Sequence, residues 1–184
     1  MKIINIQKNT NNKFLNHYTL ELESEDNKKR NYFIASRRDE EELTCKTKNH
    51  NKCDAVMIVS KTIEGDFYLV KQFRPAINDY IYEFPAGLID ENETIEEAAR
   101  RELFEETGLK GTEYKLLVKP SYTSVGMSDE NIAIVEMIVS GEPTTENTEE
   151  TEEIEIVKIK KQDIDKLLQK ENVSIKAALV LRLQ

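Results

Sequence analysis

The spacing of apolar residues divides the chain into a weakly apolar beginning and a more strongly apolar remainder. Short runs in which apolar and polar residues partly alternate predict strands at residues 3–6, 14–22 and 31–36. Residues 26–29 have the composition of a hairpin turn between the second and third of these strands. Because strands with so few apolar residues are only marginally stable alone, we expect residues 1–50 to form a small antiparallel β-domain that packs on the main domain or on a second subunit.

The pattern changes after a charged and polar segment, residues 37–53, which is predicted to be a linker or mobile loop. The main domain is assigned to residues 51–184. A nearly continuous apolar run at 55–60 predicts a strand that is buried on both faces, and a turn signal at 64–66 joins it to a second strand at 67–74. Further strands are predicted at 80–84, 114–118, 131–139 and 154–159, and helices at 95–107, 163–170 and 174–183. The last strand alternates cleanly, so half of its side chains should be exposed.

The helix predicted at residues 95–107 has recognisable signals at both ends. Thr94, followed three residues later by Glu97, is typical of an N-terminal capping box. Gly108 is a natural C-terminal stop, and a turn at residues 85–87 precedes the helix. Neither Pro nor Gly interrupts the interval, which favours one continuous helix.

One face of this helix combines acidic and small apolar residues. At roughly 100° per residue, this face carries Ile95, Ala98, Ala99, Glu102, Glu105, Glu106 and Leu109. Like charges one turn apart destabilise a helix by roughly 0.2–0.5 kcal/mol per pair, and partial burial raises that cost. A positive group should therefore compensate the three carboxylates, and ligands that are all oxygen favour Mg²⁺ or Mn²⁺. Helix geometry alone leaves a solvated acidic helix as the alternative.

The same stretch follows a longer spacing pattern. Its fixed positions are Gly87, Glu93, Arg101, Glu102, Leu103, Glu105, Glu106, Gly108 and Leu109. This pattern resembles the Nudix box, and the chain is identified as a member of the Nudix hydrolases, which cleave nucleoside diphosphates linked to another moiety. The resemblance implies an α/β fold, the Nudix α/β/α sandwich with a mixed sheet.

The resemblance also implies roles for individual residues. Glu102, Glu105 and Glu106 are expected to hold one or more Mg²⁺ or Mn²⁺ ions, with the carbonyl of Ala86 as a further metal ligand. Glu105 and Arg101 are assigned to the catalytic set. For Arg101 the expected role is to orient a carboxylate of the box rather than to contact substrate.

The sequence before the helix resembles that of the ADP-ribose and nucleoside-diphosphate-sugar pyrophosphatases. Residues 71–76 and 82–87 are close to the pattern of that subgroup, which implies substrate contacts from Arg74 and Glu83. The planar guanidinium of Arg74 suits the anionic oxygens of a phosphate or the hydroxyls of a ribose. The alternative is that Arg74 is an exposed strand-end residue paired with a carboxylate such as Glu83.

Two segments after the helix extend this resemblance. Residues 124–130 stand at the distance from the box where the subgroup has a Ser-Pro-Gly loop, which assigns Gly126 and Glu130 to substrate binding, Glu130 at the terminal sugar. Val125 occupies the position where Pro is usual, so the shape of the loop and the selectivity for ADP-ribose are open.

Residues 141–153 are so acidic that composition alone would assign them to a disordered loop. The resemblance matches them to an acidic loop that supplies the general base, here Glu150, with Glu152 as an extra metal ligand. Because the alignment of an acidic run can slip, Glu149, Glu152 and Glu153 are alternatives for the base. A base on such a loop could close over bound substrate and exclude bulk water.

Charge and composition limit the partners and the compartment. The formal net charge of −9 argues against binding to duplex nucleic acid, which needs a basic surface, but not against a small phosphate-bearing substrate. No apolar run approaches the ~20 residues that span a bilayer, and the first residues lack the pattern of a secretion signal. Cys45 and Cys53 are expected to be reduced thiols, and His17 and His50 ordinary surface residues. These features predict a cytoplasmic protein that binds neither nucleic acid nor membrane.

The resemblance therefore implies a metal-dependent pyrophosphatase that converts ADP-ribose to AMP and ribose 5-phosphate, or a related nucleotide sugar to a nucleoside monophosphate and a sugar phosphate. It also implies a homodimer in which the small β-domain packs across the partner. Other substrates stay open, namely GDP-mannose, NADH, coenzyme A and oxidised nucleoside triphosphates. A module that binds a nucleotide without turnover is a further alternative, although such modules are expected to lose carboxylates of the box.

Overall fold

The computed structural model describes residues 1–148 and 153–183. The chain forms two compact units. The first consists of Met1–Asp54 and Pro120–Ile132, and the second of Ala55–Lys119 and Ala133–Gln184. The predicted boundary near residue 50 did not anticipate that a later segment, 120–132, belongs to the first unit.

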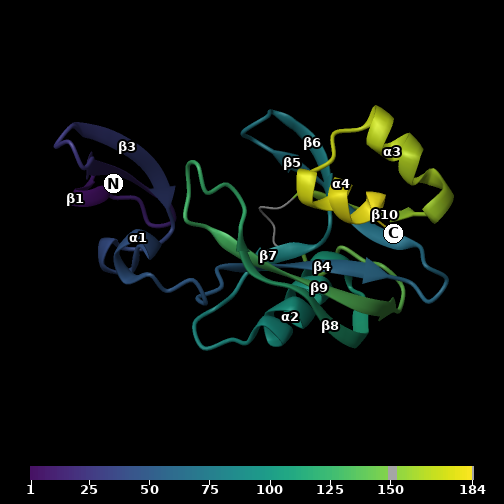
Figure 1. Ribbon diagram of the computed structural model, residues 1–184. Coiled ribbons are helices and arrows are strands. Elements are labelled where there is room, and N and C mark those ends of the chain that lie inside the picture. The colour runs from purple at the N-terminus through teal and green to yellow at the C-terminus, as the bar shows by residue number, and fades with distance from the viewer. Residues whose placement is uncertain (149–152, 184) are drawn as a thin grey trace. The chain divides into compact units, whose positions relative to one another are not determined.

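The first unit contains a three-stranded antiparallel sheet in the order β1–β2–β3 (Figure 1). Its strands are β1 (Lys2–Lys8), β2 (Asn16–Glu23) and β3 (Lys29–Ser36). The three predicted strands are therefore confirmed, each with somewhat different ends. Alternation along β2 turns Tyr18 and Leu20 to one face, where they form a small core with Ile34 of β3 and Leu43.

The prediction of a linker or mobile loop at residues 37–53 is wrong. The segment contains the 3₁₀ turn η1 (Glu40–Glu42) and the short helix α1 (Thr44–Thr47). Leu43 between them is completely buried, so this polar segment supplies an apolar side chain that the weakly apolar strands lack. The first unit thus has a core of its own.

The second unit is built on a seven-stranded mixed sheet with the order β10–β5–β4–β9–β8, in which β6 also pairs with β5 and β7 with β4. The strands are β4 (Ala55–Lys61), β5 (Phe67–Arg74), β6 (Asp79–Glu83), β7 (Ala86–Leu88), β8 (Lys110–Tyr122), β9 (Asn131–Ser140) and β10 (Ile154–Ile159). β5 pairs antiparallel with β4, β6 and β10.

Most predicted strands of this sheet are confirmed. β4 is buried on both faces, as its continuous apolar run indicates, while β10 pairs along the sheet edge with β5 and keeps exposed positions. The predicted turn at residues 85–87 is wrong in part, because Ala86–Leu88 is strand β7, paired antiparallel with β4. β8 is longer at both ends than the predicted 114–118.

Helices cover the sheet of the second unit on two sides. The helices are α2 (Ile95–Thr107), α3 (Ile164–Lys170), which follows the 3₁₀ turn η2 (Lys161–Asp163), and α4 (Ile175–Arg182). α2 packs against β4 and β7, and Figure 1 shows α3 and α4 on the opposite side, with α4 in contact with β6. This arrangement is the predicted α/β/α sandwich. Within the described residues, no helix is both long enough and apolar enough to cross a bilayer.

The burial of Leu43 yields a stability prediction for the first unit. Leu43→Ala should lower the free energy of unfolding by about 2–5 kcal/mol, because it removes a fully buried side chain and leaves a cavity. The matched control is Leu15→Ala, since Leu15 in the same unit is 47% exposed, and it should change stability by ~0.5 kcal/mol or less. Urea unfolding followed by circular dichroism measures both, and equal effects of the two variants would contradict the packing described here.

Candidate active site

Helix α2 begins and ends where its sequence indicates. The Thr94 side chain accepts a hydrogen bond from the Glu97 N–H, and the Glu97 carboxylate accepts one from the Thr94 N–H at 2.9 Å, which completes the predicted capping box. At the other end Gly108 has φ +68°, a left-handed conformation that glycine adopts without steric cost. The helix is therefore fixed at both termini by local interactions.

Arg101 lies at the centre of the acidic cluster on α2. Its Nε and Nη2 donate to the two carboxylate oxygens of Glu93 at 2.9 and 2.8 Å. Its Nη1 donates to Glu102 Oε1 at 2.7 Å and to Glu105 Oε2 at 3.1 Å. Nη2 also donates to the Leu88 carbonyl of β7 at 3.0 Å. One guanidinium thus ties the loop before the helix, strand β7 and two helix carboxylates together.

These contacts stabilise the charged forms of both Glu93 and Arg101. The hydrogen bonds from Arg101 hold the pKa of Glu93 below its ordinary value, and Glu93 in turn is the main group that raises the pKa of Arg101. The positive group that the sequence required beside Glu102 and Glu105 is present in the protein itself. Sequence reasoning assigned that compensation to a metal ion and gave Arg101 only an orienting role.

Two backbone positions of β7 hold the other carboxylates close to the sheet. Glu106 is only 5% exposed, and its Oε2 accepts a hydrogen bond from the Ala86 N–H at 3.1 Å. A Cβ on Gly87 would lie 2.0 Å from the Glu102 Cδ, so only glycine at this position leaves room for that carboxylate. Glu106 therefore lies beside Ala86, and Glu102 beside Gly87.

The donor chemistry of this cluster fits a hard divalent cation. Glu102, Glu105 and Glu106 supply only carboxylate oxygens, the ligands that Mg²⁺ and Mn²⁺ prefer, and Ala86 lies at the same strand–helix contact through its N–H. In the conformation described, however, Arg101 holds two of the carboxylates, and the described residues contain no group of three metal-ligating side chains close enough to share an ion.

Arg74 is the last residue of β5 and pairs with Asp79, whereas Glu83 is the last residue of β6 and pairs with Val70. The Arg74 Nε donates to Glu83 Oε2 at 2.8 Å, and the Arg74 side chain is about half exposed. This is the ion pair that the sequence left as the alternative to a substrate contact. Because the guanidinium has five N–H donors, the pair leaves further donors for an anionic ligand.

Part of the acidic loop lies outside the residues that the structure describes. This applies to Glu150, the predicted base, to Glu152, the predicted extra ligand, and to the alternative Glu149. The last alternative, Glu153, accepts a hydrogen bond from the Tyr80 hydroxyl. That bond is the main cause of a raised Tyr80 pKa.

The segment before the acidic run contacts the end of α2. The Thr144 N–H donates to the Thr107 carbonyl at 2.9 Å, and the Thr148 hydroxyl donates to the Glu105 carbonyl at 3.4 Å. These bonds satisfy carbonyls that a helix terminus leaves without an intrahelical partner. A Cβ on Gly108 would lie 2.4 Å from the Thr144 Cγ2. The close approach of Thr144 therefore favours glycine at this position, in addition to the positive φ. Nothing in the local sequence signals these long-range contacts.

Two predicted substrate-binding residues, the two cysteines and the two histidines lie away from α2 in the sequence. Gly126 and Glu130 lie in the segment between β8 and β9 that belongs to the first unit. Cys45 and Cys53 form no disulfide, and burial raises the pKa of the Cys45 thiol. His17 and His50 are exposed, as predicted. His17 stacks on Phe33 and His50 contacts the Tyr122 hydroxyl.

Comparisons with known proteins agree with this geometry. The family model described as NUDIX domain matches residues 51–183. The chain is 45% identical over 69 residues to an ADP-sugar pyrophosphatase from Mus musculus, a match covering 37% of this chain and 32% of that protein. It is 42% identical over 81 residues to an ADP-ribose pyrophosphatase from Bacillus subtilis, covering 44% of this chain and 43% of that protein.

The chain therefore spans less than half the length of each of these two relatives. A solved structure described as the crystal structure of ADP compounds hydrolase has a TM-score of 0.77 to this chain. It covers 99% of the chain and 91% of its own length at 22% identity. At that identity the likeness shows the fold.

The contact between Glu93 and Arg101 predicts a pH dependence of stability. The folded-state pKa of Glu93 lies below the ordinary value of 4.5, so the contribution of this pair is fully present above about pH 4.5. It is lost as the pH falls through the lower folded-state pKa, where Glu93 becomes protonated in the folded protein as well. Glu93→Gln should cost about 1–3 kcal/mol at pH 7, and its deficit relative to wild type should vanish in acid.

Urea unfolding of both proteins between pH 3 and pH 7 measures this difference. Glu91→Gln, a substitution at an exposed position of the same turn, should match wild type at pH 7. A deficit of Glu93→Gln that persists undiminished in acid would show that the ion pair is not its source.

Proposed function

The chain belongs to the Nudix family, and on this premise we propose that it hydrolyses the diphosphate linkage of ADP-ribose or of a related nucleoside diphosphate sugar. The products are a nucleoside monophosphate and a sugar phosphate. The single observation that carries the proposal is the arrangement around α2, where Glu106 lies beside Ala86 and Glu102 beside Gly87 of β7, and Arg101 joins Glu102 to Glu105. The names of the relatives from Mus musculus and Bacillus subtilis support the choice of substrate class.

The carboxylates of α2 are proposed to hold Mg²⁺ or Mn²⁺, with the Ala86 carbonyl and Glu152 as further ligands. A bound divalent cation would neutralise charge on the phosphate oxygens and lower the pKa of a bound water. The cation and Arg101 compete for the same oxygens of Glu102 and Glu105. Arg101 also makes two hydrogen bonds to Glu93. Its bonds to Glu102 and Glu105 can therefore break while Glu93 keeps the guanidinium in place.

The other residues are proposed to bind substrate and to move a proton. Arg74, oriented by Glu83, would donate to phosphate oxygens, and Glu130, with the backbone of Gly126, would contact the terminal sugar. Glu150 would take the proton of the attacking water. General-base catalysis of this kind contributes roughly 10²–10⁴-fold.

We also infer a homodimer and a cytoplasmic location. Large apolar side chains are exposed on β8 and in the first unit, among them Leu116, Leu117, Val118, Phe14 and Phe33. Exposed apolar residues of this size are typical of surfaces that a partner covers, which supports a second copy of the chain. Cys45 and Cys53 are not joined in a disulfide, which suits the reducing cytosol.

The test is a substrate panel with Mg²⁺, read as phosphate that a phosphatase releases from the products. ADP-ribose and other ADP-sugars should give the highest kcat/KM, ahead of GDP-mannose, NADH, coenzyme A and oxidised nucleoside triphosphates. Glu102→Gln should reduce kcat by at least ~10–100-fold, because it removes a charged ligand from the cluster. The control Glu96→Gln, on α2 but paired with Arg100, should keep wild-type turnover.

Two results would reject the proposal. Binding of ADP-ribose without turnover of any substrate would indicate a nucleotide-sensing module. Wild-type turnover by Glu102→Gln would show that the reaction does not need the carboxylates of α2.

Gly87 gives a sharper prediction about metal binding. In Gly87→Ala the new Cβ would displace the Glu102 carboxylate, which is the flexible end of its side chain and can move at small cost to the fold. We expect a near-normal unfolding midpoint and a ~10–100-fold higher Mg²⁺ concentration for half-maximal activity.

The matched control is Gly111→Ala, whose Cβ would lie 2.4 Å from the Met137 Sδ in the core. It should lower the unfolding midpoint and leave the Mg²⁺ requirement of the folded enzyme unchanged. An unaltered Mg²⁺ requirement in Gly87→Ala would argue that Glu102 is not a metal ligand.

A further inference from the structure

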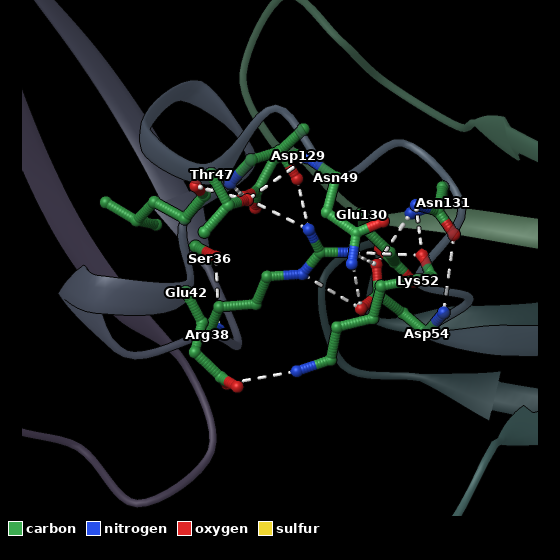
Figure 2. A network of polar contacts seen from close by, with 12 residues as sticks. Ser36, Arg38, Glu42, Thr47, Asn49, Lys52, Asp54, Asp129, Glu130 and Asn131 are labelled. Carbon is green, nitrogen blue, oxygen red and sulfur yellow. Dashed lines mark hydrogen bonds and ion pairs between the residues drawn. The ribbon is translucent and has the colours of Figure 1, made fainter.

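The first unit contains a buried arginine whose side chain is only 4% exposed (Figure 2). Arg38 binds Asp54 through both of its carboxylate oxygens, with Nη2 at 2.9 Å from each and Nε at 3.1 Å from Oδ1. Its Nη1 donates to the Thr44 hydroxyl and lies 4.0 Å from Asp129 Oδ2. We call Arg38, Asp54 and Asp129 the Arg38 hub.

The hub fixes the residues on both sides of Glu130. On one side, the Asp129 carboxylate accepts a hydrogen bond from the Thr44 N–H at 3.0 Å. On the other side, Asp54 Oδ2 accepts the Asn131 N–H at 2.9 Å, and the Asn131 side-chain amide donates to the Lys52 carbonyl at 2.7 Å. Figure 2 shows these partners converging from segments that are far apart in the sequence.

The tip of the same loop is tied to strand β3. The Tyr32 hydroxyl donates to the Gly126 carbonyl, and the Ala35 N–H donates to the Met127 carbonyl at 2.9 Å. Ala35 also forms a parallel bridge with Ser128. Loop 123–130 is therefore held at its base by the hub and at its tip by the N-terminal sheet.

Glu130 itself is fixed through its backbone and keeps its carboxylate available. Its N–H donates to the Ser128 hydroxyl at 3.1 Å, and its carbonyl accepts from the Thr123 N–H at 3.1 Å. Across the described part of the chain, the Glu130 carboxylate takes part in no hydrogen bond or ion pair with another side chain. A side chain held in this way is preorganised for a ligand hydroxyl, because little of its backbone freedom remains to be lost on binding.

We propose that the Arg38 hub positions Glu130 and thereby sets the affinity for the sugar beyond the diphosphate. Asp129 and Asp54 are positioning residues, since they act through the backbone of Glu130 and not on the substrate. The proposal rests on the proposed function, in which Glu130 contacts the terminal sugar. It gives the N-terminal sheet a part in substrate selectivity, although Arg38 lies outside the segment 51–183 that matches the family model.

The physical reason is that a buried guanidinium tolerates few arrangements of its partners. A buried charge is stable only while it is paired and hydrogen-bonded, and a shift of loop 123–130 would move Asp129 away from Arg38 and from the Thr44 N–H. The hub therefore favours one loop conformation over the alternatives. A loop held only by its own turns would have no comparable constraint.

The experiment compares Asp129→Asn with wild type on two substrates in the presence of Mg²⁺. One substrate is ADP-ribose, and the other is ADP methylated on its terminal phosphate, which keeps the diphosphate and lacks the sugar. Asp129→Asn should raise KM for ADP-ribose about tenfold and leave kcat within about twofold, because a contact equal in ground and transition states affects KM alone. Both constants for methyl-ADP should stay at the wild-type value.

Two further variants separate positioning from general damage. In the Asp129→Asn/Glu130→Gln double variant, KM for ADP-ribose should be no higher than in Glu130→Gln alone, since the hub acts through Glu130. Tyr32→Phe, which removes only the hydroxyl tether at the loop tip, should raise the same KM to a smaller extent, and it carries the test if Asp129→Asn does not fold. Asp39→Asn, an exposed aspartate of the same unit, should match wild type.

Equal losses on both substrates, or additive effects in the double variant, would overturn the inference and leave the proposed function intact. Unchanged constants in Asp129→Asn or, should that variant not fold, in Tyr32→Phe would do the same. A wild-type protein that hydrolyses neither substrate would overturn ADP-ribose as the proposed substrate, and the inference with it.

Discussion

Three carboxylates on two turns of one helix repel one another unless a positive group stands among them, and the structure around α2 follows from this constraint. Arg101 supplies that charge through hydrogen bonds to Glu93, Glu102 and Glu105, and its contact with Leu88 attaches the helix to β7. The protein itself therefore neutralises part of the acidic cluster. In the proposed function a divalent cation would have to displace the guanidinium from Glu102 and Glu105, which its double charge favours.

The two units use arginine in different ways because the degree of burial differs. Arg101 is 29% exposed, and water remains available when its contacts to Glu102 and Glu105 loosen. Arg38 is almost completely buried, so a lost partner leaves a charge that water cannot solvate. The first arginine suits a site whose partners exchange during function. The second suits a scaffold whose partners must stay in place.

The sequence predicted those parts of the fold whose signals are local. The apolar run of β4 and the capping residues of α2 act through neighbours in the chain or through simple burial, and both were confirmed. The segment 37–53 was misjudged because its order depends on Arg38, whose partners are as distant as Asp129. β7 was taken for a turn because its pairing with β4 joins residues about 30 positions apart.

In the candidate site, too, the features with local signals could be predicted and those that depend on distant contacts could not. The resemblance assigned Ala86 and the helix carboxylates to one metal site, and the structure brings Glu102 and Glu106 beside the backbone of Gly87 and Ala86. The position of Arg101 between carboxylates could be read as orienting, but its bridge from Glu93 to Glu105 required the folded loop. The contacts that hold the two ends of the acidic loop, Thr144 with Thr107 and Glu153 with Tyr80, had no local signal at all.

At Val125, hydrogen bonds around the loop take the place of the backbone restraint that a proline would impose. Proline at this position would fix φ near −65° and restrict the residue before it, so its absence leaves the loop shape without that local restraint. Val125 is 70% exposed and supplies no packing in exchange. The Ser124 carbonyl instead accepts the N–H groups of Met127 and Ser128 at 2.9 Å, while Tyr32 and Ala35 hold the tip from β3. A loop whose shape comes partly from distant hydrogen bonds depends on the N-terminal sheet, and under the proposed function its sugar selectivity would then change through residues that never meet the substrate.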